Sequence, residues 1–274
     1  GGDIDVQVFG ANSLVGAKKN IVSVAKGDID CGFSVNFQWG KTLPMMNVTL
    51  APFAFGDINL WRKWPGTKSA AFLNKKLLEK GVHNAVWLFT TNSSVFSSKG
   101  KALIKPADFK GLKIRGLAPA FNKSLQALGA APSSMSGSKV YPALATGVID
   151  AGLTDVAAAV SRKYYEVQDH FTVVPLISVY FHGYVNPKWY NDLSAKSKAA
   201  VDSAGNKAAG WAIDASVAAS SAAPDQLRAK GAKVHIASAA EIKVLEDIMR
   251  PAFDASFAGD DADTNKLLKL LAAE

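Results

Sequence analysis

The fold is decided by the stretch Asp108-Phe109-Lys110-Gly111-Leu112-Lys113-Ile114-Arg115. Its apolar part, continued to Leu117, predicts a short strand. Pro119 suits the first turn of a helix, and Gly129 suits the end of that helix. A strand, a tight turn and a helix in this order predict a doubly wound α/β sheet, with Arg115 late in a buried strand.

Arg115 carries the central functional prediction. A guanidinium in a buried strand cannot stay unpaired without a large free-energy cost, and the carboxyl ends of such strands are where ligands bind. Its planar donors match a carboxylate bidentately. We therefore predict that Arg115 binds a ligand carboxylate. The alternative is a structural ion pair with a nearby acid such as Asp150, and the residues alone leave both interpretations open.

One phrase occurs twice, as Gly27-Asp28-Ile29-Asp30-Cys31-Gly32-Phe33-Ser34 and as Gly147-Val148-Ile149-Asp150-Ala151-Gly152-Leu153-Thr154. In each copy a glycine ends a helix, and a short strand then leads to a hydroxyl residue. Two copies about half a chain apart predict two domains built on one plan, and not a solenoid. If both strands end at a shared cleft, Ser34–Trp39 and Thr154–Asp155 face the same ligand as Arg115. The repeat is also explained by a shared way of packing a helix on a strand.

The remaining elements follow from hydrophobic periodicity and from the positions of glycine and proline. We expect a loop and a short extended run at Pro44–Phe55, and a polar crossing between the domains at Asn92–Lys105. Further strands are predicted at Ile4–Phe9, Val82–Thr90, Phe171–Leu176, Ser178–Asn186 and Lys233–Ile236. Further helices are predicted at Ser13–Lys26, Asn59–Trp64, Ser69–Lys80, Lys139–Ala145, Ala239–Ala258 and Asp263–Ala273.

The alanine-rich run from Ser194 to about Lys230 predicts a helix about 50 Å long, with Pro224 kinking or breaking it. A helix of this length exceeds one small domain, so we expect it to brace both. We predict that domain I comprises residues 1–92 and 181–220, and that domain II comprises 93–180 and 221–274. The fold class is α/β, a two-domain arrangement like that of type II periplasmic binding proteins, with the domains hinged by strands and the long helix.

The composition excludes several classes of protein. The chain has 274 residues and a formal net charge of +8, but its lysines are spread along it with little aromatic interleaving. We therefore expect a solvated basic surface that helps to attract acidic ligands, and no nucleic-acid partner. Cys31 is the only cysteine, which rules out an internal disulfide or a multi-cysteine metal site, and we expect it to be a small buried side chain. The sequence contains no run of about 20 apolar residues, so we expect no membrane-spanning helix.

Two segments supply further candidates for the ligand site. Trp39 lies in the polar loop Asn36-Phe37-Gln38-Trp39-Gly40 and forms either a flat wall for an organic ligand or ordinary packing. Alternation in the strand Ser178–Asn186 places His182 on one face and Phe181 on the other, and one of those faces is expected to line the cleft. The predicted ligand-binding residues are Arg115, Asn36, Phe37, Trp39, Thr154, Asp155, Phe181 and His182. No metal or cofactor is expected.

Four stretches together resemble the solute-binding proteins of tripartite ATP-independent periplasmic (TRAP) transporters, the DctP family. They are Asp108–Arg115, Ala127-Leu128-Gly129-Ala130-Ala131-Pro132, Val140-Tyr141-Pro142-Ala143-Leu144-Ala145-Thr146-Gly147-Val148-Ile149-Asp150 and Asn186-Pro187-Lys188-Trp189-Tyr190. The resemblance runs in the family's order over nearly the whole chain. It implies a periplasmic receptor, expected to be a monomer, whose two domains close around an organic acid and deliver it to TRAP membrane subunits. The family's carboxylate-binding arginine falls on Arg115.

The chain departs from the family at three places. The family's ligand-binding asparagine is replaced by Thr154 or Asp155, and a second arginine found in some members falls near the apolar Val95. Both changes argue against a sialic acid or small dicarboxylate specialist, and Asp155 suggests a ligand with hydroxyls or an amine. The family is also expected to carry a strand and a helix ahead of the segment that begins at Gly2. The aromatic candidates for the cleft, such as Phe37, favour an aromatic or medium-sized organic acid as the ligand.

Other functions are less well supported by the residues. The sequence has no Gly-x-Ser-x-Gly elbow, Walker loop, Gly-x-Gly-x-x-Gly or His-Glu-x-x-His motif, and its histidines are dispersed, so we expect no enzyme. The alternative function is a ligand-sensing domain of the same fold that works with a signalling partner such as a sensor kinase.

Overall fold

A computed structural model describes residues 2–10, 13–17, 19–91, 93–257 and 261–274. Asn92, where the predicted crossing begins, and Ala258, where a closing helix was predicted to end, lie outside the described residues. Within the described residues, no helix is both long and apolar enough to cross a membrane.

The first sheet has the strand order β1-β8-β2, and β8 pairs antiparallel with both of its neighbours. Its strands are β1 (Cys31–Val35), β2 (His83–Thr91) and β8 (Val179–Val185). Tyr180 and Tyr184 are buried on the face of β8 that packs into an aromatic core with Trp61 and Trp87. Phe181, between them in sequence, lies on the other face, as alternation along a strand requires.

The second sheet has the strand order β6-β3-β7-β9, with β3 antiparallel to β6 and β7, and β7 parallel to β9. These strands are β3 (Ser94–Ser98), β6 (Gly152–Asp155), β7 (His170–Val174) and β9 (Lys233–Ile236). β4 (Lys113–Gly116) and β5 (Ala131–Ser134) form a short parallel pair. This pair lies beside the start of β6, where the Arg115 N–H donates to the carbonyl of Ala151, the residue before β6. The molecule is therefore built from two α/β units, as the sequence predicts.

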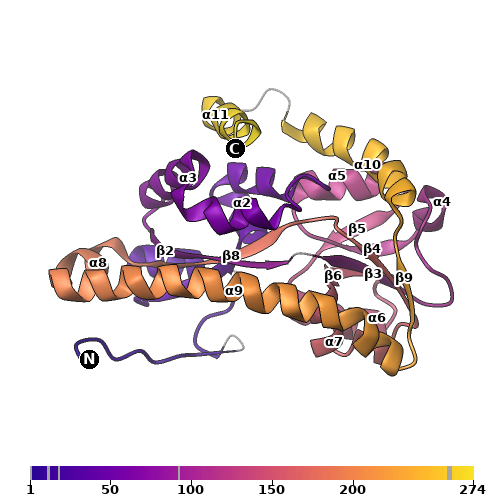
Figure 1. Cartoon of the computed structure of the whole chain (residues 1–274), viewed down its shortest axis with the longest axis horizontal. Coiled ribbons are helices and arrows are strands. Elements are labelled where there is room, and N and C mark those ends of the chain that lie inside the picture. Colours follow the sequence, from indigo (N-terminus) through magenta and orange to yellow (C-terminus); the bar gives the residue numbers. More distant parts are fainter. Residues whose placement is uncertain (1, 11–12, 18, 92, 258–260) are drawn as a thin grey trace.

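Helices cover these sheets and connect them (Figure 1). The α-helices are α1 (Asn20–Lys26), α2 (Ile58–Lys63), α3 (Lys68–Glu79), α4 (Pro106–Phe109), α5 (Pro119–Ala127), α6 (Val140–Ala145), α7 (Val156–Ser161), α8 (Pro187–Asp192), α9 (Ala195–Ala229), α10 (Ala239–Asp254) and α11 (Ala262–Ala272). Short 3-10 helices occupy Asn36–Lys41, Pro44–Leu50, Trp64–Gly66, Gly137–Lys139, Tyr164–Glu166 and Ala255–Phe257.

The long helix α9 spans both units. It packs against β2 of the first sheet and against α7 and β9 of the second (Figure 1). Ser194 caps its start by accepting a hydrogen bond from the Ser197 N–H. The prediction was that Pro224 kinks or breaks this helix, and a break is wrong, because the 35 residues of α9 form one helix that includes Pro224. Packing on both units holds the helix together where its local sequence would interrupt it.

The repeated phrase forms the same structure twice. α1 ends at Gly27, whose φ of 81° is left-handed, and β1 follows. α6 is followed by Gly147, with a φ of 72°, and then by β6. Only glycine adopts this backbone conformation without strain, so the repeat marks the same helix–turn–strand connection in each unit.

Several local predictions are wrong. Ile4–Phe9 forms no strand, because no sheet in the described part of the chain pairs with it. The helix expected from Ser13 begins only at Asn20. Asn92–Lys105 contains β3, which is buried between β6 and β7 and is not a bare crossing. Cys31 is exposed, because β1 is an edge strand and alternation turns that side chain away from the core.

The domain boundaries stay a prediction, but the packing of the C-terminal helices bears on them. α10 packs against α5, an element of predicted domain II. α11 instead packs against α3, an element of predicted domain I. The C-terminal segment thus contacts both units.

Candidate functional site

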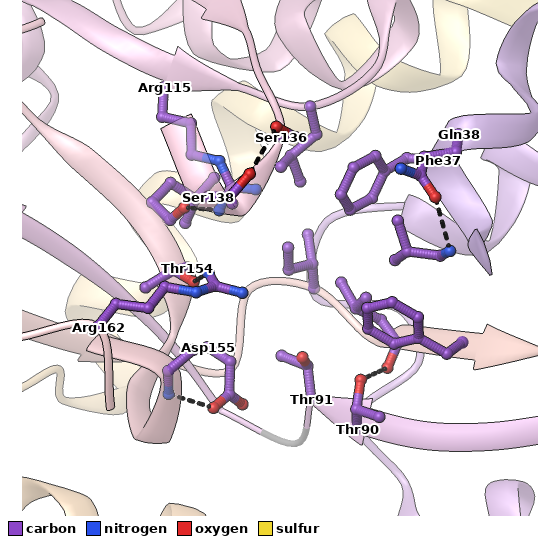
Figure 2. Close-up of a pocket in the computed structure, with 18 of the residues that line it drawn as sticks. Phe37, Gln38, Thr90, Thr91, Arg115, Ser136, Ser138, Thr154, Asp155 and Arg162 are labelled. Atoms are coloured by element: carbon purple, nitrogen blue, oxygen red, sulfur yellow. Dashed lines mark hydrogen bonds between the residues drawn. The ribbon is translucent and has the colours of Figure 1, made fainter. Parts of the chain in front are cut away.

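A cavity of about 300 Å³ lies where strand ends of the two units meet (Figure 2). β4, β6 and α7 supply one wall, and β1, β2, β8 and the 3-10 helix Asn36–Lys41 supply the other. The lining residues are Ala17, Val35, Phe37, Gln38, Thr90, Thr91, Arg115, Leu117, Ser136, Gly137, Ser138, Leu153, Thr154, Asp155, Ala158, Arg162, Ile177, Val179 and Phe181. Its size suits a small organic molecule.

Arg115 is the most deeply buried charge at this cavity, with an exposed fraction of 4%. Nη1 donates to the Leu153 carbonyl at 2.6 Å and Nε donates to the Met135 carbonyl at 3.4 Å, and Nη2 takes part in neither bond. Burial lowers the pKa of Arg115 to about 10, and the positive charge of Arg162 acts in the same direction. The side chain therefore stays charged at neutral pH.

The alternative ion pair with Asp150 is not formed. The Asp150 carboxylate instead accepts a hydrogen bond at 2.8 Å from the N–H of Lys113, the first residue of β4. Among the described residues, no acid forms an ion pair with Arg115. Two carbonyl oxygens satisfy only some of the guanidinium donors and do not balance its charge. An anion in the cavity would accept hydrogen bonds from the remaining donors and balance the charge.

The end of β6 supplies Thr154 and Asp155 beside Arg115. Asp155 caps α7, where Oδ1 accepts from the Ala158 N–H at 3.0 Å. Burial raises the pKa of Asp155 to about 6, although backbone N–H groups and Arg162 partly oppose this shift. Thr154 accepts a hydrogen bond from Nη1 of Arg162 at 3.0 Å.

The facing wall is mainly apolar. Phe37 and Gln38 come from the 3-10 helix after β1, and Phe181 comes from β8 with 37% of its surface exposed. Gln38 is oriented by its Oε1, which accepts from the Val35 N–H at 3.1 Å. Figure 2 shows Phe37 and Gln38 on the opposite side of the cavity from Arg115 and Arg162. The structure thus brings together five predicted residues: Arg115, Phe37, Thr154, Asp155 and Phe181.

Trp39, Asn36 and His182 do not line the cavity, contrary to their predicted place in the site. Trp39 is fully buried, with its ring centroid 5.2 Å from that of His182. Asn36 is also fully buried, and its Nδ2 donates to the Thr49 hydroxyl at 3.0 Å. Sequence neighbours in a strand or tight helix point to different sides, so Phe37 and Phe181 face the cavity while these three residues face the core.

His182 is a core residue held in its neutral form. Its Nδ1 lies 3.0 Å from Oδ1 of Asn84, and Trp87 stacks against the ring with centroids 5.3 Å apart. Burial lowers the pKa of His182 to about 3. The side chain therefore contributes packing and one hydrogen bond, and no charge at neutral pH.

The cavity is also lined by polar residues that were not among the predicted ligand-binding residues. Arg162 is the C-cap of α7, directly after Ser161, and a basic residue at the end of a helix is common. Ser138 lies in the 3-10 helix Gly137–Lys139 after β5, and Ser136 directly precedes that helix. Thr90 and Thr91 end β2. A hydroxyl residue at the end of a predicted strand indicates a site residue, as it did for Thr154 in the repeat, so Thr90 and Thr91 could have been predicted in the same way. No feature of the sequence indicated Arg162.

A cavity between two α/β units is the architecture of periplasmic solute-binding proteins. The family model for the bacterial extracellular solute-binding protein, family 7 (DctP), matches residues 1–260. The chain belongs to this family. The family comprises solute receptors and is not an enzyme class.

The chain is about a quarter identical to two curated relatives. A solute-binding protein of Albidiferax ferrireducens is 27% identical over 62% of this chain and 50% of its own length. The C4-dicarboxylate-binding periplasmic protein DctP of Rhodobacter capsulatus is 26% identical over 100% of this chain and 82% of its own length. The chain thus spans between half and about four fifths of these relatives.

Solved structures share the fold closely. The TRAP periplasmic solute-binding protein of Rhodoferax ferrireducens, with bound malonate, has a TM-score of 0.92 at 23% identity, covering 99% of this chain and 86% of that one. The one from Sulfitobacter, with bound β-D-galacturonate, has a TM-score of 0.90 at 20% identity, covering 100% and 90%. At these identities the likeness establishes the fold.

Proposed function

We propose that this protein is a periplasmic receptor that binds an organic acid through Arg115 and delivers it to the membrane subunits of a TRAP transporter. The observation that carries the proposal is the buried guanidinium of Arg115. It faces the cavity with no acidic partner among the described residues. A carboxylate is the ligand group that satisfies it best.

Binding requires both walls of the cavity. Arg115 and Thr154 come from β4 and β6, in the unit of the second sheet. Phe37 and Phe181 come from the 3-10 helix after β1 and from β8, in the unit of the first sheet. A ligand that contacts both walls favours the closed state, because in an open state it touches only one of them. The chain crosses between the units from β2 to β3 and from β7 to β8. The helix α9 packs on both units, so these two crossings and α9 are the proposed hinge. We propose that the receptor works as a monomer.

The ligands bound to solved relatives support this proposal. Solved members hold malonate, β-D-galacturonate, orotic acid and L-malate. All of these carry a carboxylate. They include both monocarboxylates and dicarboxylates, so the fold does not choose between the two.

A thermal-shift screen of the purified protein tests the binding proposal. The panel contains aromatic carboxylates, sugar acids, keto acids and dicarboxylates, each paired with its uncharged amide where one exists. A matching acid is expected to stabilise the native state by roughly 2.7 kcal/mol at a hundred times its dissociation constant, and its amide is expected to have little effect. Stabilisation by uncharged or cationic compounds alone would contradict a carboxylate receptor.

Delivery is tested in vesicles that contain TRAP membrane subunits. Uptake of the acid found in the screen is expected to require this protein and an ion gradient. Tight binding with no stimulation of uptake by any such subunit pair would favour the signalling alternative.

A further inference from the structure

Three of the side chains that line the cavity carry a charge: Arg115, Arg162 and Asp155. With Asp155 ionised, they sum to one positive charge. The polar residues on the rest of the wall, such as Gln38, Thr90 and Ser136, are neutral. One ligand carboxylate therefore balances the site, and a second leaves an excess of negative charge in a partly buried cavity.

The Asp155 carboxylate is fixed in place and incompletely paired. Oδ1 caps α7, while Oδ2 is shielded from solvent and has no hydrogen-bond partner among the described residues. The groups that face it are Arg162 from the end of α7 and Thr91 from the end of β2. Arg162 donates to Thr154 and forms no ion pair with Asp155 within the described chain. The positive charge of Arg162 and the N–H groups of α7 therefore offset the negative charge of Asp155 only in part.

We propose that Asp155 makes this receptor selective for hydroxylated monocarboxylates and excludes dicarboxylates. The inference rests on the function proposed above. Arg115 binds the single ligand carboxylate. The other end of the ligand then lies towards Asp155 and the neutral hydroxyl groups at the end of β2, which match hydroxyl groups and not a second anion.

The selectivity is expected to depend on pH. Burial raises the pKa of Asp155 to about 6, so the carboxyl is ionised at neutral pH and mostly protonated near pH 5. Protonation removes the negative charge that repels a second carboxylate, while Arg115 and Arg162 keep their charges. Exclusion of dicarboxylates should therefore be strong at about pH 7.5 and weak at about pH 5.

Matched ligand pairs test this inference by calorimetric titration of the full chain. Each pair differs only in a terminal CH₂OH or COO⁻ group: glycerate and tartronate, 4-hydroxybutyrate and succinate, galactonate and galactarate. In whichever pair binds, the hydroxy acid should bind about tenfold or more tightly at about pH 7.5. Asp155→Asn keeps the helix cap and removes the charge, and should reduce that preference by about tenfold. Asp192→Asn, at the exposed end of α8, changes the net charge equally and should leave the preference intact.

The wild type and Asp155→Asn are compared with each other at about pH 5. Protonation of the ligand carboxylates affects both proteins equally and therefore cancels in this comparison. There the wild-type preference should approach that of Asp155→Asn. A wild type that binds the dicarboxylate more tightly at about pH 7.5, or a preference that Asp155→Asn leaves unchanged, would overturn the inference while the receptor function stands. Absence of binding by every acid in the pairs and in the wider panel would instead overturn the proposed function.

Discussion

Arg115→Met is expected to weaken binding of the cognate acid by about a hundredfold or more. A charge-assisted hydrogen bond to a buried partner contributes about 1.5–3 kcal/mol, and a carboxylate on Arg115 is expected to accept two. Methionine retains the apolar stem and donates none. The measurement is calorimetric titration with the acid identified in the thermal-shift screen.

Folding should be largely preserved in Arg115→Met. The substitution leaves the Leu153 and Met135 carbonyls without their side-chain donor, but it also removes a buried charge that has no acidic partner in the described chain. The melting temperature of the ligand-free variant is therefore expected to change little. Arg228→Met, at an exposed position late in α9, is the matched control and should bind normally. Equal affinity in Arg115→Met and wild type would show that Arg115 does not hold the ligand.

Trp39→Ala is expected to destabilise the protein by about 3–5 kcal/mol, as truncation of a large core side chain does. The indole is fully buried against His182 and Tyr184, with ring centroids 5.2 and 5.6 Å away. Its removal leaves a cavity in the aromatic core under the first sheet. Urea unfolding of the ligand-free protein measures this loss directly.

Phe37→Ala is the matched comparison, two residues earlier in the same 3-10 helix. Phe37 is partly exposed and lines the cavity, so its truncation should cost less stability and weaken ligand binding about tenfold. The opposite pattern, in which Trp39→Ala stays stable but loses affinity, would restore Trp39 to the ligand site and contradict its core role.

The sequence predicted well the elements that depend on neighbours within the chain. Three local units form as expected: the strand that contains Arg115, the helix begun by Pro119, and the glycine-ended helix followed by a strand in each copy of the repeat. Each depends on a local signal: a proline at a first turn, a left-handed glycine or a periodic apolar run. These signals are independent of what the segment later contacts.

Predictions failed where a distant segment decides the outcome. Ile4–Phe9 has the alternation of a strand, but a strand exists only where another pairs with it. Pro224 should interrupt α9 by local rules, yet packing against both units carries the helix through it. The exposed Cys31 follows from β1 lying at a sheet edge, which the sequence does not reveal.

The sequence by itself determined the α/β class, the doubled plan and the choice of Arg115 as the principal ligand candidate. Only the tertiary structure separated Phe37 from Trp39 and Phe181 from His182, and placed Arg162 beside Asp155. It also left Arg115 without an acidic partner among the residues that the structure describes. Residue type and spacing specify which side chains a strand or turn presents. Whether a side chain faces a cavity or the core depends on which elements cover it, and those elements come from distant parts of the chain.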